Sequence, residues 1–106
     1  MLSKLNTLCR IINCGVIAVV RAESFEEAKK IVDAIKDGGI EAIEITMTVP
    51  KALDLIEELC SNFGKDEVLI GAGTILDSET ARMAIIKGAE FIVSPHFNAD
   101  VIRMAN

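Results

Sequence analysis

The fold of this chain is decided by residues 40–50, which read IEAIEITMTVP. Residues 42–46 are mostly small or β-branched, and such a run predicts a strand of a parallel sheet, buried on both faces. Gly38 and Gly39 come just before it and predict the end of a helix, because the left-handed conformation common at helix ends favours glycine. Pro50 predicts the first turn of the next helix, where its missing N–H costs nothing.

The same helix–strand unit recurs along the whole chain. A first helix is expected from Ser3 to Ile12, and Ser24 with Glu27 forms a capping box ahead of another helical pattern. The strands are expected at Val16–Val20, Ala42–Thr46, Val68–Ala72 and Phe91–Val93. The helices that follow them are expected to begin after Ser24, at Pro50, after Asp77 or Ser78, and near Asn98.

This alternation predicts an α/β fold with a parallel sheet and right-handed crossovers. Two architectures are common for such a pattern: an open doubly wound sheet and an eight-stranded (β/α)8 TIM barrel. A spacing of ~25 residues from one strand to the next suits a compact barrel of ~200 residues. Residues 1–106 are then expected to be the N-terminal half of one barrel domain, with the first helix and four strand–helix units.

One face of each expected strand changes from apolar to polar toward its carboxyl end. The opposite face of the second strand, with Ile43, Ile45 and Met47, is apolar and is expected to meet the helices. Polar groups gathered at the carboxyl ends are typical of barrel enzymes, and this pattern favours the barrel over the open sheet. The expected sets are Ile17, Val19 and Arg21; Ala42, Glu44 and Thr46; Ile70, Ala72 and Thr74; and Ile92, Ser94 and His96.

Charge and cysteine content exclude several classes of protein. The net charge is −5 and no basic run exists, which argues against nucleic-acid binding. No stretch approaches the ~20 apolar residues of a membrane span. Three cysteines without framework spacing favour reduced thiols in the cytoplasm, and a single histidine gives little support to a zinc site.

Glu44 is the residue that most strongly indicates chemistry. A carboxylate inside a buried strand is expensive unless it is paired or used. It is interpreted either as a general acid/base whose pKa burial raises, or as half of a structural ion pair with Arg21. Arg21, at the end of the first strand, has a second interpretation as the binding group for a substrate carboxylate or phosphate.

Two further motifs end the third and fourth strands. Gly71-Ala72-Gly73-Thr74 resembles neither a dinucleotide fingerprint nor a P-loop. Its glycines allow either close approach of a ligand, with a hydrogen bond from Thr74, or simply a crowded strand end. In Ser94-Pro95-His96, the spacing of serine and histidine does not make a nucleophile pair, and His96 is interpreted mainly as a rim residue.

Four motifs together resemble the bifunctional 2-keto-3-deoxy-6-phosphogluconate / 4-hydroxy-2-oxoglutarate aldolases. The resemblance covers nearly the whole chain, in order and with matching spacing. It is carried by residues 17–22 (IAVVRA), 43–46 (IEIT), 71–74 (GAGT) and 91–96 (FIVSPH).

The resemblance implies a homotrimeric barrel, without a metal or other cofactor, that cleaves a 2-keto-3-deoxy-6-phospho sugar acid into pyruvate and glyceraldehyde 3-phosphate. A lysine forms a Schiff base with the keto carbon, which makes an electron sink. Glu44 matches the proton-shuttling glutamate, and Thr74 matches a threonine that contacts the pyruvate carboxylate. Thr48 stands where many members have an arginine for that carboxylate, so Arg21 is expected to supply the guanidinium; Pro95 joins the expected substrate-binding residues.

The resemblance also implies that the Schiff-base lysine lies on the sixth strand, beyond this chain. None of the seven lysines lies within an expected strand, and the chain alone is therefore expected to be inactive. Two alternatives remain open from the residues: a small α/β domain that binds a ligand or partner, and a half-barrel that pairs with a second copy.

Overall fold

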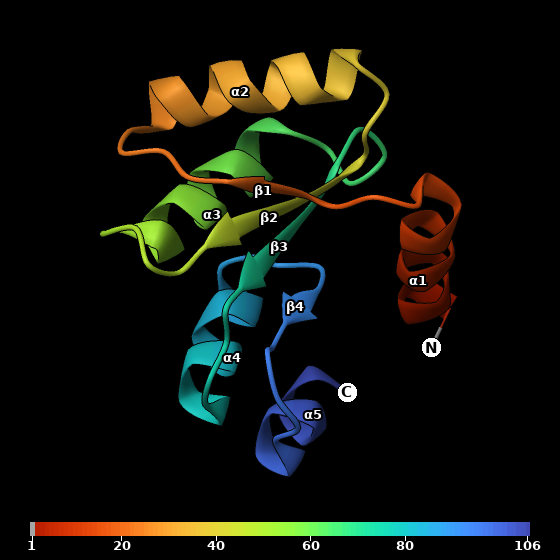
Figure 1. The fold of residues 1–106 in the computed structure, drawn as a ribbon, viewed down its shortest axis with the longest axis vertical. Helices are drawn as coiled ribbons and strands as arrows, with labels where there is room; N and C mark the ends of the chain where they lie inside the picture. Colours follow the sequence, from red (N-terminus) through yellow and green to blue (C-terminus); the bar gives the residue numbers. More distant parts are fainter. Residues whose placement is uncertain (1) are drawn as a thin grey trace.

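Each strand of this chain is followed by a helix, as the sequence pattern predicts (Figure 1). The computed structural model describes residues 2–106. The helices are α1 (Leu2–Cys14), α2 (Phe25–Asp37), α3 (Ala52–Asn62), α4 (Ser78–Ile86) and α5 (Ala99–Ala105). The strands are β1 (Ala18–Val20), β2 (Ala42–Thr46), β3 (Leu69–Gly73) and β4 (Ile92–Val93).

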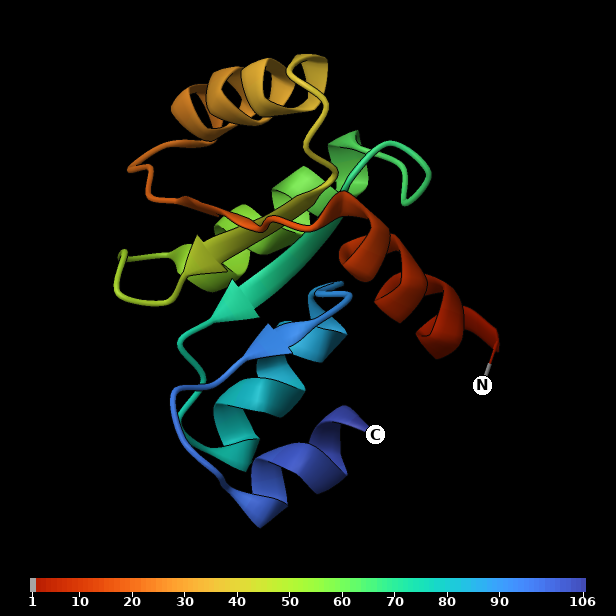
Figure 2. The same ribbon diagram turned by 45° about the vertical axis from the view of Figure 1, so that its right-hand side comes forward.

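The four strands form one parallel sheet in the order β1-β2-β3-β4. Each new strand is added beside the previous one, so the order never reverses as it does in a doubly wound sheet. Winding in one direction leaves α2, α3 and α4 on the same side of the sheet (Figures 1 and 2). This is the arrangement of a barrel segment, and the predicted α/β barrel architecture is confirmed.

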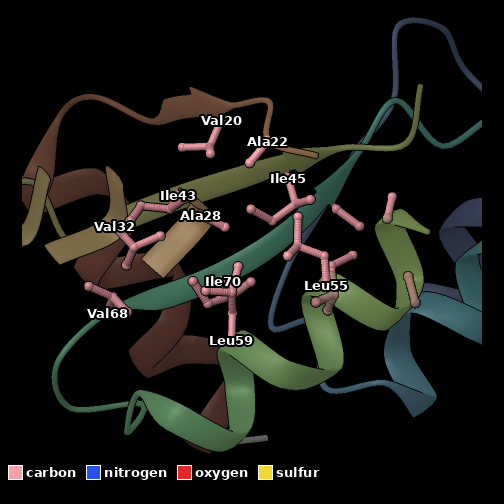
Figure 3. Close-up of a cluster of buried hydrophobic side chains, with 14 of the residues drawn as sticks. Val20, Ala22, Ala28, Val32, Ile43, Ile45, Leu55, Leu59, Val68 and Ile70 are labelled. Carbon is pink, nitrogen blue, oxygen red and sulfur yellow. The ribbon is translucent and has the colours of Figure 1, made fainter. Parts of the chain in front are cut away.

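The hydrophobic core lies between the sheet and these three helices (Figure 3). Ile43 and Ile45 of β2 are fully buried there, together with Val32 of α2 and Ile56 and Leu59 of α3. Aliphatic side chains on the helix-facing side of the strands thus meet the apolar stripes of the helices, as alternation along β2 predicts.

Strand register corrects one expectation about the faces of the sheet. Glu44 is aligned with Gly71, and Thr46 is aligned with Gly73. The expectation that Ile70 and Ala72 share the face of Glu44 is wrong, because both belong to the helix-facing core. The same shift applies to β4, where Ile92 is aligned with Ala72. A slip of one residue exchanges the two faces of a strand, and only pairing with the neighbouring strand fixes it.

The capping residues predicted for α2 and α4 are confirmed, and Asn98, near which the last helix is expected to begin, proves to be a further cap. The side-chain oxygens of Ser24, Asp77 and Asn98 accept hydrogen bonds from backbone N–H groups in the first turns of α2, α4 and α5. Pro50 does not occupy the first turn of α3 as expected: the helix begins at Ala52, after Lys51, which adopts a left-handed conformation with φ of 64°.

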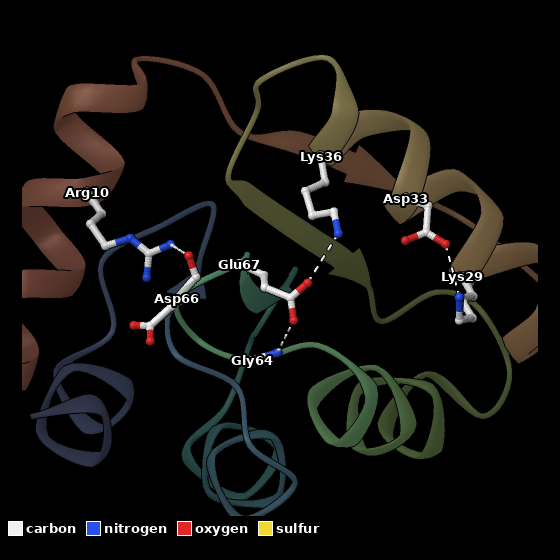
Figure 4. Close-up of polar contacts among 7 residues, drawn as sticks. All are labelled: Arg10, Lys29, Asp33, Lys36, Gly64, Asp66 and Glu67. Atoms are coloured by element: carbon white, nitrogen blue, oxygen red, sulfur yellow. Dashed lines mark hydrogen bonds and ion pairs between the residues drawn. The ribbon is translucent and has the colours of Figure 1, made fainter.

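Helix α1 stands apart from the others, beside the amino ends of the strands (Figure 1). The helix expected from Ser3 to Ile12 is longer in the structure, because α1 runs from Leu2 to Cys14, and Ser3 therefore lies within it rather than capping it. The Arg10 guanidinium joins α1 to the loop before β3. It donates hydrogen bonds to the carbonyl oxygen of Lys65 and to that of Asp66, the second of which is drawn in Figure 4. It also lies 3.8 Å from a carboxylate oxygen of Glu41. In the described part of the chain, no helix has both the length and the apolar character needed to cross a membrane.

Candidate functional site

The expected substrate-binding residues all follow the carboxyl ends of adjacent strands. Arg21 comes directly after β1 and Thr74 directly after β3, while Thr48 and Pro95 lie two residues beyond β2 and β4. All four are exposed. Because the strands are parallel, these ends share one edge of the sheet, and this edge is where α/β proteins place their ligand sites.

Glu44 lies inside β2, on the face of the sheet that points away from the helices. Only 8% of its surface is exposed. Burial raises the pKa of its carboxyl group, since the charged form loses hydration there. Within residues 2–106 no hydrogen bond or ion pair compensates for that loss. A carboxyl group in this setting holds a proton more readily than an exposed one, as an acid/base group near neutral pH requires.

The alternative interpretation of Glu44, an ion pair with Arg21, is wrong for this structure. Arg21 lies one step beyond the Val20–Ile45 pair and is therefore level with Thr46 rather than with Glu44. Its guanidinium is exposed and makes no ion pair among the described residues. Arg21 is thus left available at the edge of the sheet where the other expected residues lie.

Side chains of this chain itself explain both glycines of the third motif. A Cβ at Gly73 would lie 2.3 Å from Oε2 of Glu44, and one at Gly71 would lie 2.4 Å from the Phe91 ring. The crowded strand end therefore accounts for both glycines, and a hydrogen bond from Thr74 to a ligand stays a prediction. The contact at Gly73 also locates the Glu44 carboxylate. The carboxylate points along β2 toward its carboxyl end and lies over Gly73, the residue aligned with Thr46 on β3.

Thr46 is a residue that the sequence analysis did not place in the site. It lies two residues after Glu44 on the same face, with 6% of its surface exposed. Its hydroxyl oxygen is buried and has no hydrogen-bond partner among residues 2–106. The available signal was a hydroxyl in an otherwise aliphatic strand, at the spacing that places two side chains on one face.

Other candidate nucleophiles lie away from Glu44. Ser94 donates its hydroxyl to the backbone oxygen of His96 at 3.2 Å, so the pair is not a nucleophile and base. The backbone N–H of Glu41 lowers the pKa of the Cys14 thiol, and burial raises the pKa of the Cys60 thiol to about 11. The described lysines lie on helices, at helix ends or in loops, and none lies within a strand.

Neither a metal cluster in the described residues nor the cavity between α2 and α3 marks a competing site. Among residues 2–106 no group of three or more His, Cys, Asp or Glu side chains is placed to hold a metal ion. A cavity of about 490 Å³ opens between the starts of α2 and α3, lined in part by Glu23, Lys51 and Asp54. None of the expected site residues lines this cavity, which lies on the helical side of the sheet.

Known proteins resemble this chain over most of its length. Residues 8–106 match the family model described as KDPG and KHG aldolase. The 2-dehydro-3-deoxy-phosphogluconate aldolase of Treponema pallidum is 39% identical over 90 residues, which are 82% of this chain and 40% of that protein. The 2-dehydro-3-deoxy-6-phosphogalactonate aldolase of Escherichia coli is 36% identical over 89 residues, 84% of this chain and 43% of that protein.

A solved structure extends the likeness to three dimensions. The KDPG aldolase of Legionella pneumophila, with pyruvate captured as a covalent carbinolamine intermediate, has a TM-score of 0.75 and 30% identity. The match covers 83% of this chain and 42% of that one. This chain therefore spans less than half the length of the relatives that it matches.

Proposed function

This chain belongs to the KDPG and KHG aldolase family, and we propose that it supplies the proton-transfer and carboxylate-binding groups of a class I aldolase. The reaction is retro-aldol cleavage of a 2-keto-3-deoxy-6-phospho sugar acid to pyruvate and glyceraldehyde 3-phosphate. The single observation that carries the proposal is Glu44, which is buried, has no charged partner among residues 2–106 and has a raised pKa. Its carboxylate reaches toward the carboxyl ends of the strands, where such enzymes bind ligands.

Glu44 has two proton transfers to perform in this reaction. Cleavage begins when the C4 hydroxyl of the substrate loses its proton, and the electron pair of the C3–C4 bond moves into a Schiff base at C2. Protonation at C3 then completes the pyruvate unit. One carboxyl group can accept the first proton and return the second, provided that its pKa lies near the working pH. Burial of Glu44 moves its pKa in that direction.

The exposed residues at the same edge are assigned to the substrate carboxylate. Thr74 offers a hydroxyl donor, and Arg21 offers a guanidinium that no other described side chain occupies. Thr48, after β2, can add a hydrogen bond but no positive charge, which is why Arg21 is the proposed counter-ion. Pro95, after β4, borders the same edge and contributes an apolar contact.

The Schiff base needs a lysine that residues 2–106 do not place near Glu44. The family resemblance locates it on a sixth strand. The covalent pyruvate carbinolamine of the Legionella relative supports this class of chemistry. A trimeric assembly and a cytoplasmic location belong to the same proposal, on the resemblance alone.

The proposal is tested by joining residues 1–106 to the C-terminal part of the Escherichia coli relative, which is 36% identical to this chain. We expect the chimera to release pyruvate from the 6-phosphorylated substrate, and Glu44→Gln to slow release by roughly 100-fold or more, the usual contribution of a general acid/base. Glu58→Gln, on the exposed surface of α3, is the matched control and should leave the rate unchanged. A chimera that traps pyruvate normally and cleaves at full rate without Glu44 would exclude this role.

A further inference from the structure

Thr46 is a buried polar residue to which the proposed mechanism gives no role. Its hydroxyl oxygen is buried and finds no hydrogen-bond partner in the described part of the chain. A buried, unsatisfied hydroxyl is unfavourable, because folding removes its water without supplying a replacement. Valine has nearly the same shape and suits a strand at least as well, so folding alone does not account for threonine here.

The candidate hydrogen-bond partner for this hydroxyl is the Glu44 carboxylate, which lies on the same face of the sheet. Glu44 and Thr46 are two residues apart on β2, and side chains at that spacing point to the same side of a sheet. The Glu44 carboxylate crosses over Gly73, and Gly73 is the residue aligned with Thr46. The carboxylate therefore ends beside Thr46 rather than beside its own aligned neighbour, Gly71.

Few other groups on this face can serve the carboxylate. The positions aligned with Glu44 are Val19 and Gly71, and those level with Thr46 are Arg21 and Gly73. Of these four, Arg21 is the one with an ionisable side chain. Arg21 and His96 stand beyond the ends of β1 and β4, and both are exposed.

We propose that Thr46 is a positioning residue for Glu44, whose carboxylate accepts a hydrogen bond from the Thr46 hydroxyl in solution. Rotation of the Glu44 side chain closes the pair without movement of the backbone. A hydroxyl can both donate and accept, so it serves the ionised and the protonated carboxyl by turning its hydrogen. This holds the reactive oxygens in one place through both proton transfers. The inference deepens the proposed function, since it gives the proton-shuttling residue its support.

The test is a pH titration of Glu44 in the chain of residues 1–106. The chemical shift of its carboxyl carbon is monitored by carbon-13 NMR, and Glu44→Gln assigns the signal. A donated hydrogen bond favours the ionised form and lowers the pKa, so its loss raises the pKa. We expect Thr46→Val to move the titration upward by about one pH unit and Thr46→Ser, which keeps the hydroxyl, to change it by less than about 0.3.

Two outcomes overturn the inference. One is a Thr46→Val chain that titrates with the parent; the other is a Thr46→Ser chain that shifts as far as Thr46→Val, which would indicate packing of the methyl group instead. If Thr46→Val does not fold, Thr46→Ala and Thr46→Ser replace it, because both lose the methyl and only serine keeps the hydroxyl. No substrate or Schiff-base lysine enters this titration, so its failure is distinct from a failure of the aldolase proposal.

Discussion

At the scale of single residues, the position of the Glu44 side chain depends on the absence of side chains at two neighbouring glycines. Gly71 and Gly73 provide the room that Phe91 and the Glu44 carboxylate occupy, and neither tolerates a Cβ without movement of the side chain above it. The two neighbours differ in how easily they can move. The Phe91 ring is rigid and turns about only two side-chain bonds, whereas a carboxylate at the end of three rotatable bonds can swing aside.

Replacing each glycine by alanine should separate these cases. We expect Gly71→Ala to lower the free energy of unfolding by about 1–3 kcal/mol, as overpacking in a core does. Gly73→Ala should cost less than about 1 kcal/mol, because the carboxylate moves instead. The displaced carboxylate gains water, so its raised pKa should fall toward the ordinary value. Urea unfolding and the Glu44 titration measure the two effects, with Gly64→Ala in an exposed loop as control. Equal costs at the two positions would contradict this reasoning.

Burial of Glu44 also makes stability depend on pH. Its folded-state pKa is raised above the unfolded value, so folding is favoured by the protonated form. That contribution is fully present below the unfolded pKa and is lost as pH rises through the folded pKa, at about 1.4 kcal/mol for each unit of difference.

The variant Glu44→Gln has no ionisable group at this position, so it does not lose stability in this way as pH rises. We expect it to gain stability relative to the parent as pH rises from acid toward neutral, in urea unfolding measured at a series of pH values. A difference between the two proteins that stays constant with pH would show that Glu44 is not titrating as a buried group. Glu67, whose pKa is lowered mainly by the backbone N–H of Gly64, contributes in the opposite direction and is present in both proteins.

At the scale of elements, α1 is attached differently from the helices that cover the sheet. Leu5, Leu8 and Ile12 on α1 are exposed, so its apolar side chains contribute little to docking here. Arg10 instead supplies two hydrogen bonds to loop carbonyls and an ion pair with Glu41. This fork geometry is specific to arginine, because lysine cannot donate along two directions in one plane.

Arg10→Lys should therefore loosen α1 although the charge is kept. We expect faster amide hydrogen exchange across residues 2–14, by about tenfold for each 1.4 kcal/mol of docking energy lost. Exchange in β2 and β3 should not change. The control is Arg103→Lys, which alters an exposed ion pair with Asp100 that is worth at most about 1 kcal/mol. Unchanged protection of α1 in the Arg10 variant would show that another contact holds the helix.

At the scale of the whole molecule, the sheet has helices on one side and candidate chemistry on the other. The face that carries Glu44 and Thr46 receives no layer from α2, α3 or α4. Exposed Val19 on this face shows that it is only partly covered within the described residues. The interpretation as a separate small ligand-binding domain has no observation that favours it over aldolase family membership.

This arrangement leads to a direct prediction for residues 1–106. Because the described lysines lie outside the strands, pyruvate followed by borohydride reduction should give no covalent adduct in intact-mass spectrometry. The chimera with the C-terminal part of the Escherichia coli relative is the positive control. A stoichiometric adduct on residues 1–106 would instead identify an activated lysine here, and peptide mapping would test Lys51 first, since it lies nearest the strand edge.

Local sequence was sufficient for much of this structure. Patterns within a few residues of each site predict the order of strands and helices, the caps at Ser24 and Asp77, and the burial of Glu44. The alternation of strands with helices also indicated a parallel sheet. Four sequence motifs in the right order indicated the family.

Contacts between distant segments decided the rest. Strand register decided the face to which Ile70 and Ala72 belong and the position of the Glu44 carboxylate over Gly73. It also placed Arg21 level with Thr46 rather than with Glu44. Alternation within one strand defines two faces but not which face of the next strand joins them, since a slip of one residue exchanges them at no local cost. Only the packing of the whole sheet against its helices selects the register, and with it the neighbours of Glu44.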